Sequence, residues 1–272
     1  MGFKDFISER WQIIKINTVE TFMLQLSSIF ENWIVLITSF FFVIINILFI
    51  NVLFTNVSTI ATYTKDQMIL FSLIGNLSFF INIAWSADNM ASLIYGVNKG
   101  DLDLILSKPL PSLFYVTFRK IDIFLFVKGF VPGAIAYIVI IKWFSLNITF
   151  ESCLAAIVIF IAGQIALNFF QFLCVIPVFF RGSAEQLMSL SWAFEYNLGR
   201  MIPLEGLDKF FRILFITLIP VMISTGLTTS VLLNKSDLLL SILFSIVVSI
   251  VFILIKILLW KFALKNYTSA SS

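Results

Sequence analysis

The chain has 272 residues, of which 60% are hydrophobic and only 12% are charged. A soluble domain carries roughly 25% charged residues, so this composition, with a mean hydropathy of +1.03, excludes a water-exposed globular surface and predicts one all-α integral membrane domain over residues 1–272. The net charge is only +3, and the lysines and arginines form no dense cluster. Both observations argue against nucleic acid as a partner. The chain has no histidine, the commonest general base and metal ligand, so neither a catalytic residue nor a metal site is predicted.

The N-terminal segment, residues 1–33, is mixed in character. From Val19 onward its apolar residues recur at the spacing of one helix face, which predicts an amphipathic helix lying along the membrane surface. A first helix packed on the bundle is the alternative. The residues of this face are Phe22, Met23, Leu26, Ile29, Phe30 and Trp33.

Six apolar runs follow, each near the ~20 residues that cross a bilayer core. They predict a six-span bundle over residues 34–260 and a tail over residues 261–272. If all six runs cross, thirteen lysines and arginines lie on the side of the N-terminus and three on the other, which places both termini in the cytoplasm. The runs are Ile34–Phe54, Met68–Ser86, Ile121–Trp143, Cys153–Phe180, Phe210–Leu233 and Leu238–Trp260.

Two lysines fall inside these runs. Lys256 lies four residues before Trp260, and we expect its side chain to reach the interface. Lys128 lies deeper, where a charge is costly and often functional. Beside it, Gly129 and Gly133 form a small-xxx-small pattern around Pro132, which favours close helix packing with a kink over a gating role, although both readings stay open.

The motifs of common enzymes are missing from the sequence. It contains no GxxxxGK[ST] loop for nucleotide phosphates, no HExxH and no GxSxG. We therefore predict that the chain is not an enzyme. No internal repeat of the kind found in secondary carriers is evident.

The loop between the second and third runs carries the most information. Between Gly100 and Pro109 the sequence predicts a two-turn helix, capped by Asp101 with Asp103 in its first turn, and with a charged rim that includes Lys108. Its apolar residues share one face, which predicts either a lid on the chain's own bundle or a docking element for a soluble partner. Those residues are Leu102, Ile105 and Leu106.

Two segments resemble a known family. The stretch from Gly100 to Pro109, GDLDLILSKP, resembles the "GDLDxxLxKP" signature of a subfamily of ABC-2 type permeases. The tail from Trp260 to Ser272, WKFALKNYTSASS, resembles the subfamily's ending "W+xxL++YSSASS", with departures at Asn266 and Thr268. The resemblance covers the chain from end to end.

This resemblance implies the permease subunit of an ATP-driven exporter in a bacterial cytoplasmic membrane. It implies that two permeases, identical or paralogous, pair with two copies of a separate ABC ATPase. ATP and Mg would bind to that ATPase, and no cofactor to this chain. The helix from Gly100 to Lys108 would be the coupling helix that the ATPase grips.

The resemblance also changes one span. It implies that Glu185–Ile202 crosses after Arg181 and ends at Pro203, and that Leu207–Leu233 is a re-entrant hairpin broken at Pro220. The Lys/Arg distribution then becomes ten against six. Hydropathy alone favours the simple crossing of Phe210–Leu233. With Glu195 and Arg200, the alternative span is too polar to face lipid, so these residues would face protein or a transport pathway.

Two rival functions remain at this point. An ATP-independent secondary carrier or channel would need paired ionisable groups at mid-membrane, where only Lys128 is expected. A membrane assembly protein without a transport role would leave the Gly100–Pro111 loop without an ATPase partner. The substrate is not predicted.

Overall fold

The computed structural model describes residues 3–27, 29–140, 146 and 148–267. Within these residues every regular element is a helix, as expected of a chain whose backbone polar groups must pair without water. The elements are α1 (Phe3–Leu26), α2 (Ile29–Leu53), α3 (Lys65–Lys99), α4 (Asp101–Leu106), α5 (Ser112–Phe118), α6 (Ile123–Ile140), α7 (Phe150–Val175), α8 (Val178–Arg181), α9 (Glu185–Met201), η2 (Leu204–Gly206), α10 (Lys209–Thr217), η3 (Pro220–Met222), η4 (Ile223–Leu227), α11 (Thr228–Leu232) and α12 (Leu238–Lys265).

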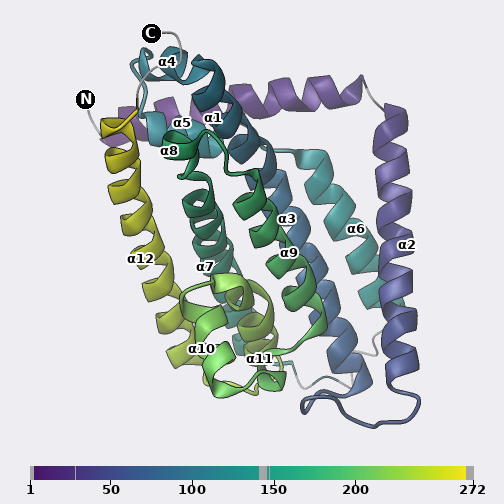
Figure 1. Cartoon of the computed structure of the whole chain (residues 1–272). Helices are drawn as coiled ribbons and strands as arrows, with labels where there is room; N and C mark the ends of the chain where they lie inside the picture. The colour runs from purple at the N-terminus through teal and green to yellow at the C-terminus, as the bar shows by residue number, and fades with distance from the viewer. Residues whose placement is uncertain (1–2, 28, 141–145, 147, 268–272) are drawn as a thin grey trace.

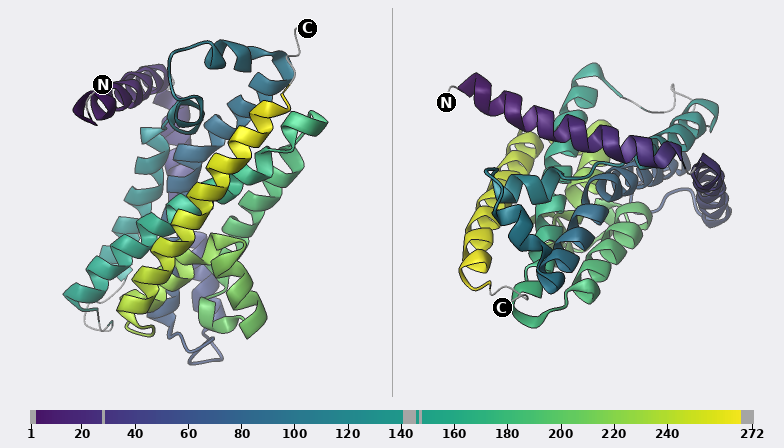
Figure 2. Two further views of the ribbon diagram at one scale, coloured as in Figure 1. Left: turned by 90° about the vertical axis from the view of Figure 1, so that its left-hand side faces the viewer. Right: turned by 90° about the horizontal axis from the view of Figure 1, so that it is seen from above.

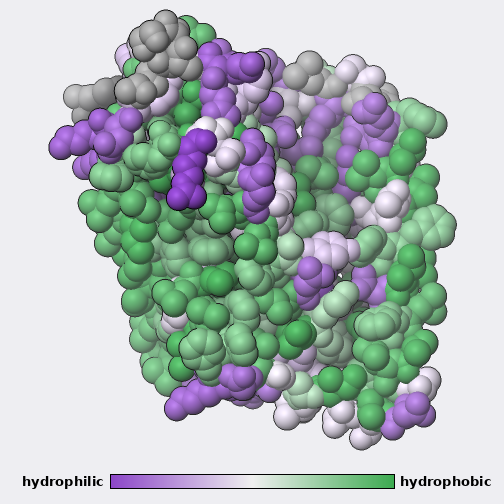
Figure 3. Space-filling view, viewed as in Figure 1, coloured by the Kyte–Doolittle hydropathy of each residue, from purple (hydrophilic) through white to green (hydrophobic). Residues whose placement is uncertain are grey.

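The long helices run between two ends of a bundle (Figure 1). We call one the α4 end, because it carries α1, α4, α5 and α8 together with the first and last described residues. The other is the hairpin end, which carries α10, α11 and the loop between α2 and α3. Hydrophilic residues gather mainly toward the two ends, and a broad hydrophobic band lies between them (Figure 3).

Four helical segments of the described residues are long and apolar enough to cross a membrane: Phe30–Leu53, Lys65–Lys99, Phe150–Arg181 and Leu238–Lys265. Two further pairs qualify only as bent units. Ser112–Phe118 and Ile123–Ile138 meet at 46°, and Lys209–Thr217 and Pro220–Leu232 meet at 82°.

The described part of the third predicted run is a single helix, whereas the fifth predicted run is broken. The third begins as α6, one residue after Asp122, whose carboxylate accepts a hydrogen bond from the Leu125 amide at 2.8 Å and so caps the helix; its last residues, 141–143, lie outside the described part. The fifth is broken at Pro220, which starts η3 and cannot donate the backbone hydrogen bond that a continuous helix needs.

The N-terminal helix lies across the α4 end of the bundle (Figure 2). It ends at Leu26, earlier than the sequence pattern predicted, and α2 begins at Ile29 in a new direction. Phe30 and Trp33, which we had assigned to the amphipathic helix, belong instead to α2 and are exposed at 77% and 59%.

Close backbone contact joins α3 to α9. A Cβ atom added at Gly75 would lie 2.1 Å from the carbonyl oxygen of Gly199, so only glycine fits there. Through this contact the polar helix α9, which is too short and polar to qualify as a candidate span by itself, is held against the centre of the bundle.

Candidate functional site

The short helix α4 stands on a hydrophobic cluster at the α4 end. It follows Gly100, whose φ of 81° is a left-handed conformation that glycine adopts without strain. Leu102 is 0% exposed and packs in a cluster with Val97, Phe172 and Trp260. Ile105 is partly buried against the same cluster.

The apolar face of α4 is therefore directed mainly into the chain itself. The sequence leaves two readings of the face formed by Leu102, Ile105 and Leu106 open, a lid on the chain's own bundle and a docking element; Leu102, whose side chain the bundle covers, fits the first. Leu104 is 65% exposed and Leu106 37% exposed. The sequence pattern showed which residues share a face, and α4 turns that face inward while it leaves Leu104 outward.

The two segments that resemble the permease family meet in space. Trp260 and Tyr267 of the C-terminal segment each lie 5.8 Å, between ring centroids, from Phe179. Burial and the neighbouring Asp103 carboxylate of α4 raise the pKa of Tyr267. The tail thus supports the base of α4, which explains in physical terms why both segments belong to one structural unit.

Beside α4 lies a polar groove of about 420 Å³. Its charged lining comes from Asp88, Asp101, Arg119 and Lys120. Just beyond the end of α4, Lys108 places its ammonium 5.0 Å from the Tyr115 ring centroid, and Pro109 follows. Leu104 is thus exposed on the same short helix whose first residue, Asp101, lines the charged groove.

A second feature is a row of buried polar side chains in the middle of the bundle, which we call the polar seam. It joins α3, α7, α9 and η4 through four hydrogen bonds, and every member is at most 5% exposed. The bonds are Arg200 Nη2 to Asn76 Oδ1 at 2.7 Å, Gln171 Nε2 to Glu195 Oε2 at 3.2 Å, Gln164 Nε2 to Ser78 Oγ at 2.7 Å, and Ser78 Oγ with Ser224 Oγ at 2.9 Å.

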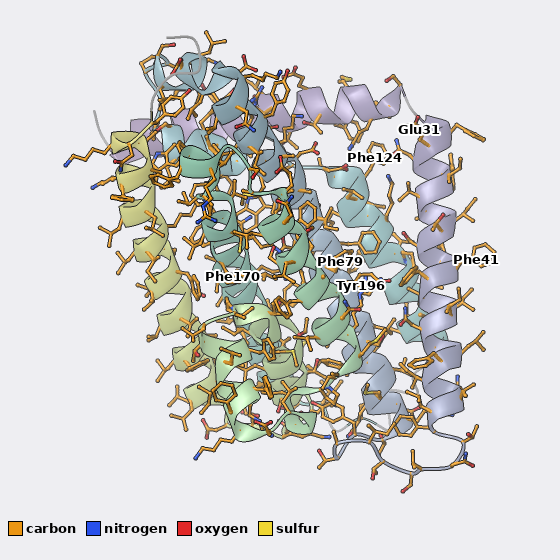
Figure 4. The ribbon with its side chains drawn as sticks, viewed as in Figure 1. Glu31, Phe41, Phe79, Phe124, Phe170 and Tyr196 are labelled. Carbon is orange, nitrogen blue, oxygen red and sulfur yellow. The ribbon has the colours of Figure 1, made fainter. Side chains whose placement is uncertain are left out.

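The guanidinium of Arg200 is enclosed by aromatic rings. Its central carbon lies 4.3 Å from the ring centroid of Tyr196, 4.8 Å from that of Phe79 and 5.4 Å from that of Phe42. Phe79 and Tyr196 lie beside each other between α3 and α9 (Figure 4), with centroids 5.2 Å apart. Such rings stabilise a cation through their π faces where water is excluded.

The seam is not fully satisfied by its own members. Within the described chain, one oxygen of Glu195 and two guanidinium nitrogens of Arg200 have no hydrogen-bond partner although they are buried, and neither do the side-chain oxygens of Gln164 and Gln171. A buried polar group without a partner is costly. Buried ionisable residues in membrane helices usually have a functional role, so the seam is a candidate functional site.

Lys256 contradicts the prediction that it reaches the interface. Its side chain is 2% exposed, and its ammonium lies 4.2 Å from the ring centroids of both Phe169 and Phe172. Lys128 is 6% exposed and donates a hydrogen bond to Asn32 Oδ1 at 2.9 Å. Lys256 therefore joins Lys128, Glu195 and Arg200 among the buried ionisable groups, which the sequence did not predict for it.

The glycines next to Lys128 have different environments. A Cβ atom at Gly129 would lie 2.2 Å from Phe80 Cβ, so this glycine allows α6 to approach α3 closely. At Gly133 nothing lies within 4 Å, and both glycines line an apolar groove of about 350 Å³. Pro132 lies inside α6 between them.

The two prolines near the hairpin mark breaks in the chain. Pro203 precedes η2 in an extended conformation, and Pro220 begins η3. Neither lies among the hydrogen-bonded members of the polar seam, which Glu195 and Arg200 do join.

Most of the polar seam was missed from the sequence. Asn76 and Ser78 lie in the second apolar run, and Gln164 and Gln171 in the fourth. Charged residues inside the runs draw attention at once, whereas uncharged amides do not. The signal was present, because Gln164, Asn168 and Gln171 recur at intervals of four and three residues and so share one face of a helix.

Apolar helices of membrane-spanning length, joined by a buried polar seam, define a multi-pass membrane protein. The chain belongs to the ABC-2 family of transporter proteins, whose model matches residues 21–271. Members of this family are membrane components of transporters, lack a nucleotide-binding motif of their own and generally pair with ABC ATPases. No curated protein and no solved structure matches the chain.

Proposed function

We propose that the chain is the permease subunit of an ATP-driven exporter in a bacterial cytoplasmic membrane. Two permeases, identical or paralogous, form the substrate pathway, and two copies of a separate ABC ATPase bind ATP and Mg and supply the energy. The observation that carries this proposal is the family match over nearly the whole chain, in a sequence without a phosphate-binding loop.

The α4 end is the cytoplasmic face in this proposal. The α4 end receives the lysines and arginines of the N-terminal segment, the Lys99–Lys120 region and the tail, as the positive-inside rule requires. Helix α9 then crosses toward the outside, and the bent pair α10–α11 forms a re-entrant hairpin at the outer end. Support for the hairpin comes from its 82° bend and from the place of α10 and α11 at one end of the bundle (Figure 1).

Docking of the ATPase takes place on α4. Leu104 offers apolar area, and the charged groove lined by Asp101 and Arg119 offers polar contacts. Leu102 anchors the helix below. A displacement of α4 by the ATPase at Leu104 would therefore be transmitted through Leu102 to α3, α7 and α12. This contact gives α4 the mechanical connection that a coupling helix needs.

The polar seam is the part of the bundle that we assign to the transport cycle. Its unpartnered groups on Glu195 and Arg200 lie on α9, and their partners lie on α3 and α7. A shift of α9 relative to its neighbours would exchange these hydrogen bonds at small net cost, because other acceptors and donors lie in the same seam.

An ATP-independent carrier is the second candidate. It gains support from the seam, because Glu195 and Arg200 supply the buried ionisable groups that such a carrier needs. The family match favours the ATP-driven exporter.

Co-purification distinguishes these functions. The tagged chain is expressed together with candidate ABC ATPases from its own genome and is purified in mild detergent. We expect the ATPase to be retained and ATP hydrolysis to depend on it, with a variant of the ATPase's phosphate-binding lysine as control. Hydrolysis by the chain purified alone, or transport that continues without the ATPase, would contradict the proposal.

A further inference from the structure

An apolar groove of about 350 Å³ lies where α1, α2 and α6 meet. Leu26 contributes from α1, Trp33 and Leu36 from α2, and Phe124 and Val127 from α6. Phe124 stacks on Phe22 of α1 with ring centroids 5.2 Å apart, which ties α1 to α6 beside the groove. The site is separate from α4 and from the polar seam.

One cation lies in the wall of this groove. Lys128 donates to Asn32 Oδ1 at 2.9 Å, and Asn32 in turn donates to the carbonyl oxygen of Gln25 at 2.7 Å. An ammonium has three donors, and one is used here. Among the described residues no carboxylate lies within 4.0 Å of the Lys128 ammonium. Asp122, the nearest acid along α6, caps the helix start through its bond from Leu125.

Lys128 lies near the start of α6, closer to the end of the bundle than the mid-membrane position expected from the sequence. Lys128 lies five residues after Ile123, the first residue of α6, which is about 7–8 Å along the helix axis. Figure 4 places Phe124 on α6 and Glu31 on the first turn of α2, both at the α4 end. Glu31 is exposed and is not part of the groove lining.

The groove is open on the lipid-facing side of the bundle. Trp33 and Val127 in its lining are exposed at 59% and 42%, as side chains in contact with acyl chains are. An occupant must therefore be amphiphilic, because it meets apolar walls along most of its length and, near α1, one cation whose charge Asp122 offsets only from beyond ion-pair distance.

We propose that this groove binds an anionic phospholipid of the leaflet at the α4 end. Its phosphate accepts a hydrogen bond from Lys128, and one acyl chain lies against Trp33, Leu36 and Val127. Charge complementarity selects an anionic lipid over a zwitterionic one, because a net negative headgroup balances the buried ammonium. The bound lipid joins the corner between α1 and α2 to α6.

Thermal unfolding in defined lipid tests this proposal. The purified chain in detergent is titrated with mixed micelles containing phosphatidylglycerol or phosphatidylcholine, and the unfolding midpoint is recorded. We expect phosphatidylglycerol to raise the midpoint more than phosphatidylcholine does. Lys128→Gln should raise the concentration of phosphatidylglycerol needed for half the effect about tenfold or more, whereas Lys128→Arg should keep it close to the wild-type value.

Two controls separate lipid binding from folding and from general charge. Asn32→Ala removes the hydrogen bond to Lys128 but keeps the cation, so it should lower the basal midpoint and preserve the preference for phosphatidylglycerol. Lys120→Gln removes a lysine at the same end whose side chain is 42% exposed, and should leave the preference unchanged. Equal effects of the two lipids on the wild type, a full response in Lys128→Gln, or equal losses in Lys128→Gln and Lys120→Gln would each overturn the proposal. If Lys128→Gln does not fold, native mass spectrometry of lipids retained by the wild type and by Lys128→Arg decides, and retention of phosphatidylcholine in preference would overturn it.

Discussion

Two neighbouring leucines on α4 allow folding and docking to be separated. Leu102 is 0% exposed, and Leu102→Ala would leave a cavity in the cluster below α4, at a cost of about 2–5 kcal/mol in the free energy of unfolding. Leu104 is 65% exposed, so Leu104→Ala should change that free energy by less than about 0.5 kcal/mol.

The effects on docking should be reversed. If an ATPase covers the exposed part of Leu104, about two thirds of the ~1.5–3 kcal/mol for a fully buried leucine is gained in the complex. Leu104→Ala should then weaken ATPase binding by about 5- to 30-fold. Leu102→Ala should affect binding only as far as it destabilises the permease.

The assay pairs two measurements on each variant. The unfolding midpoint in detergent reports on folding, and ATPase retained on the immobilised permease over a concentration series reports on docking. Leu239, which is 67% exposed near the hairpin end, provides a control of matched exposure as Leu239→Ala. Unchanged ATPase binding by a well-folded Leu104→Ala variant would refute the docking role of α4.

Three further predictions concern the bundle. Gly75→Ala should destabilise the fold by about 1–3 kcal/mol because α3 must move away from α9, whereas Gly133→Ala, with nothing within 4 Å, should not; thermal unfolding compares them directly. Asn76→Ala removes the side-chain acceptor of the buried Arg200 guanidinium and should lower the free energy of unfolding by about 1–3 kcal/mol. Asn76→Asp supplies a carboxylate acceptor and should lower it less. In a cysteine-free background, Asp208→Cys should react with an impermeant thiol reagent on intact cells, and Asn266→Cys should not. If Asp208→Cys reacts only after the membrane has been permeabilised, the simple crossing replaces the hairpin.

Hydropathy predicted most of the spans because the bilayer imposes one simple demand on a helix: length with apolar side chains. That signal located α2, α3, α7 and α12. It could not find α9, in which the polar residues Ser191, Glu195 and Arg200 are buried against other helices. Which residues a helix can expose depends on its neighbours, and the neighbours are not encoded in the local pattern.

The candidate sites show the same limit. The spacing of Leu102 and Ile105 predicted one face of α4 but not what covers it. Lys256 was expected at the interface because it is near a helix end, yet Phe169 and Phe172 offer their ring faces to its ammonium inside the bundle. Such partners lie far away in sequence, on α7, and only the packing of α7 against α12 brings them together.

The most direct test of an ATP-driven permease is a crosslink at α4. Leu104→Cys is placed in a background without Cys153 and Cys174, and the chain is co-expressed with the ABC ATPase that co-purifies with it. A short thiol-reactive crosslinker should join position 104 to the ATPase, and ATP should change the yield as the complex moves through its cycle. Leu239→Cys, at the other end of the bundle, should give no crosslink. A folded complex in which position 104 never reaches the ATPase, with or without ATP, would contradict the account.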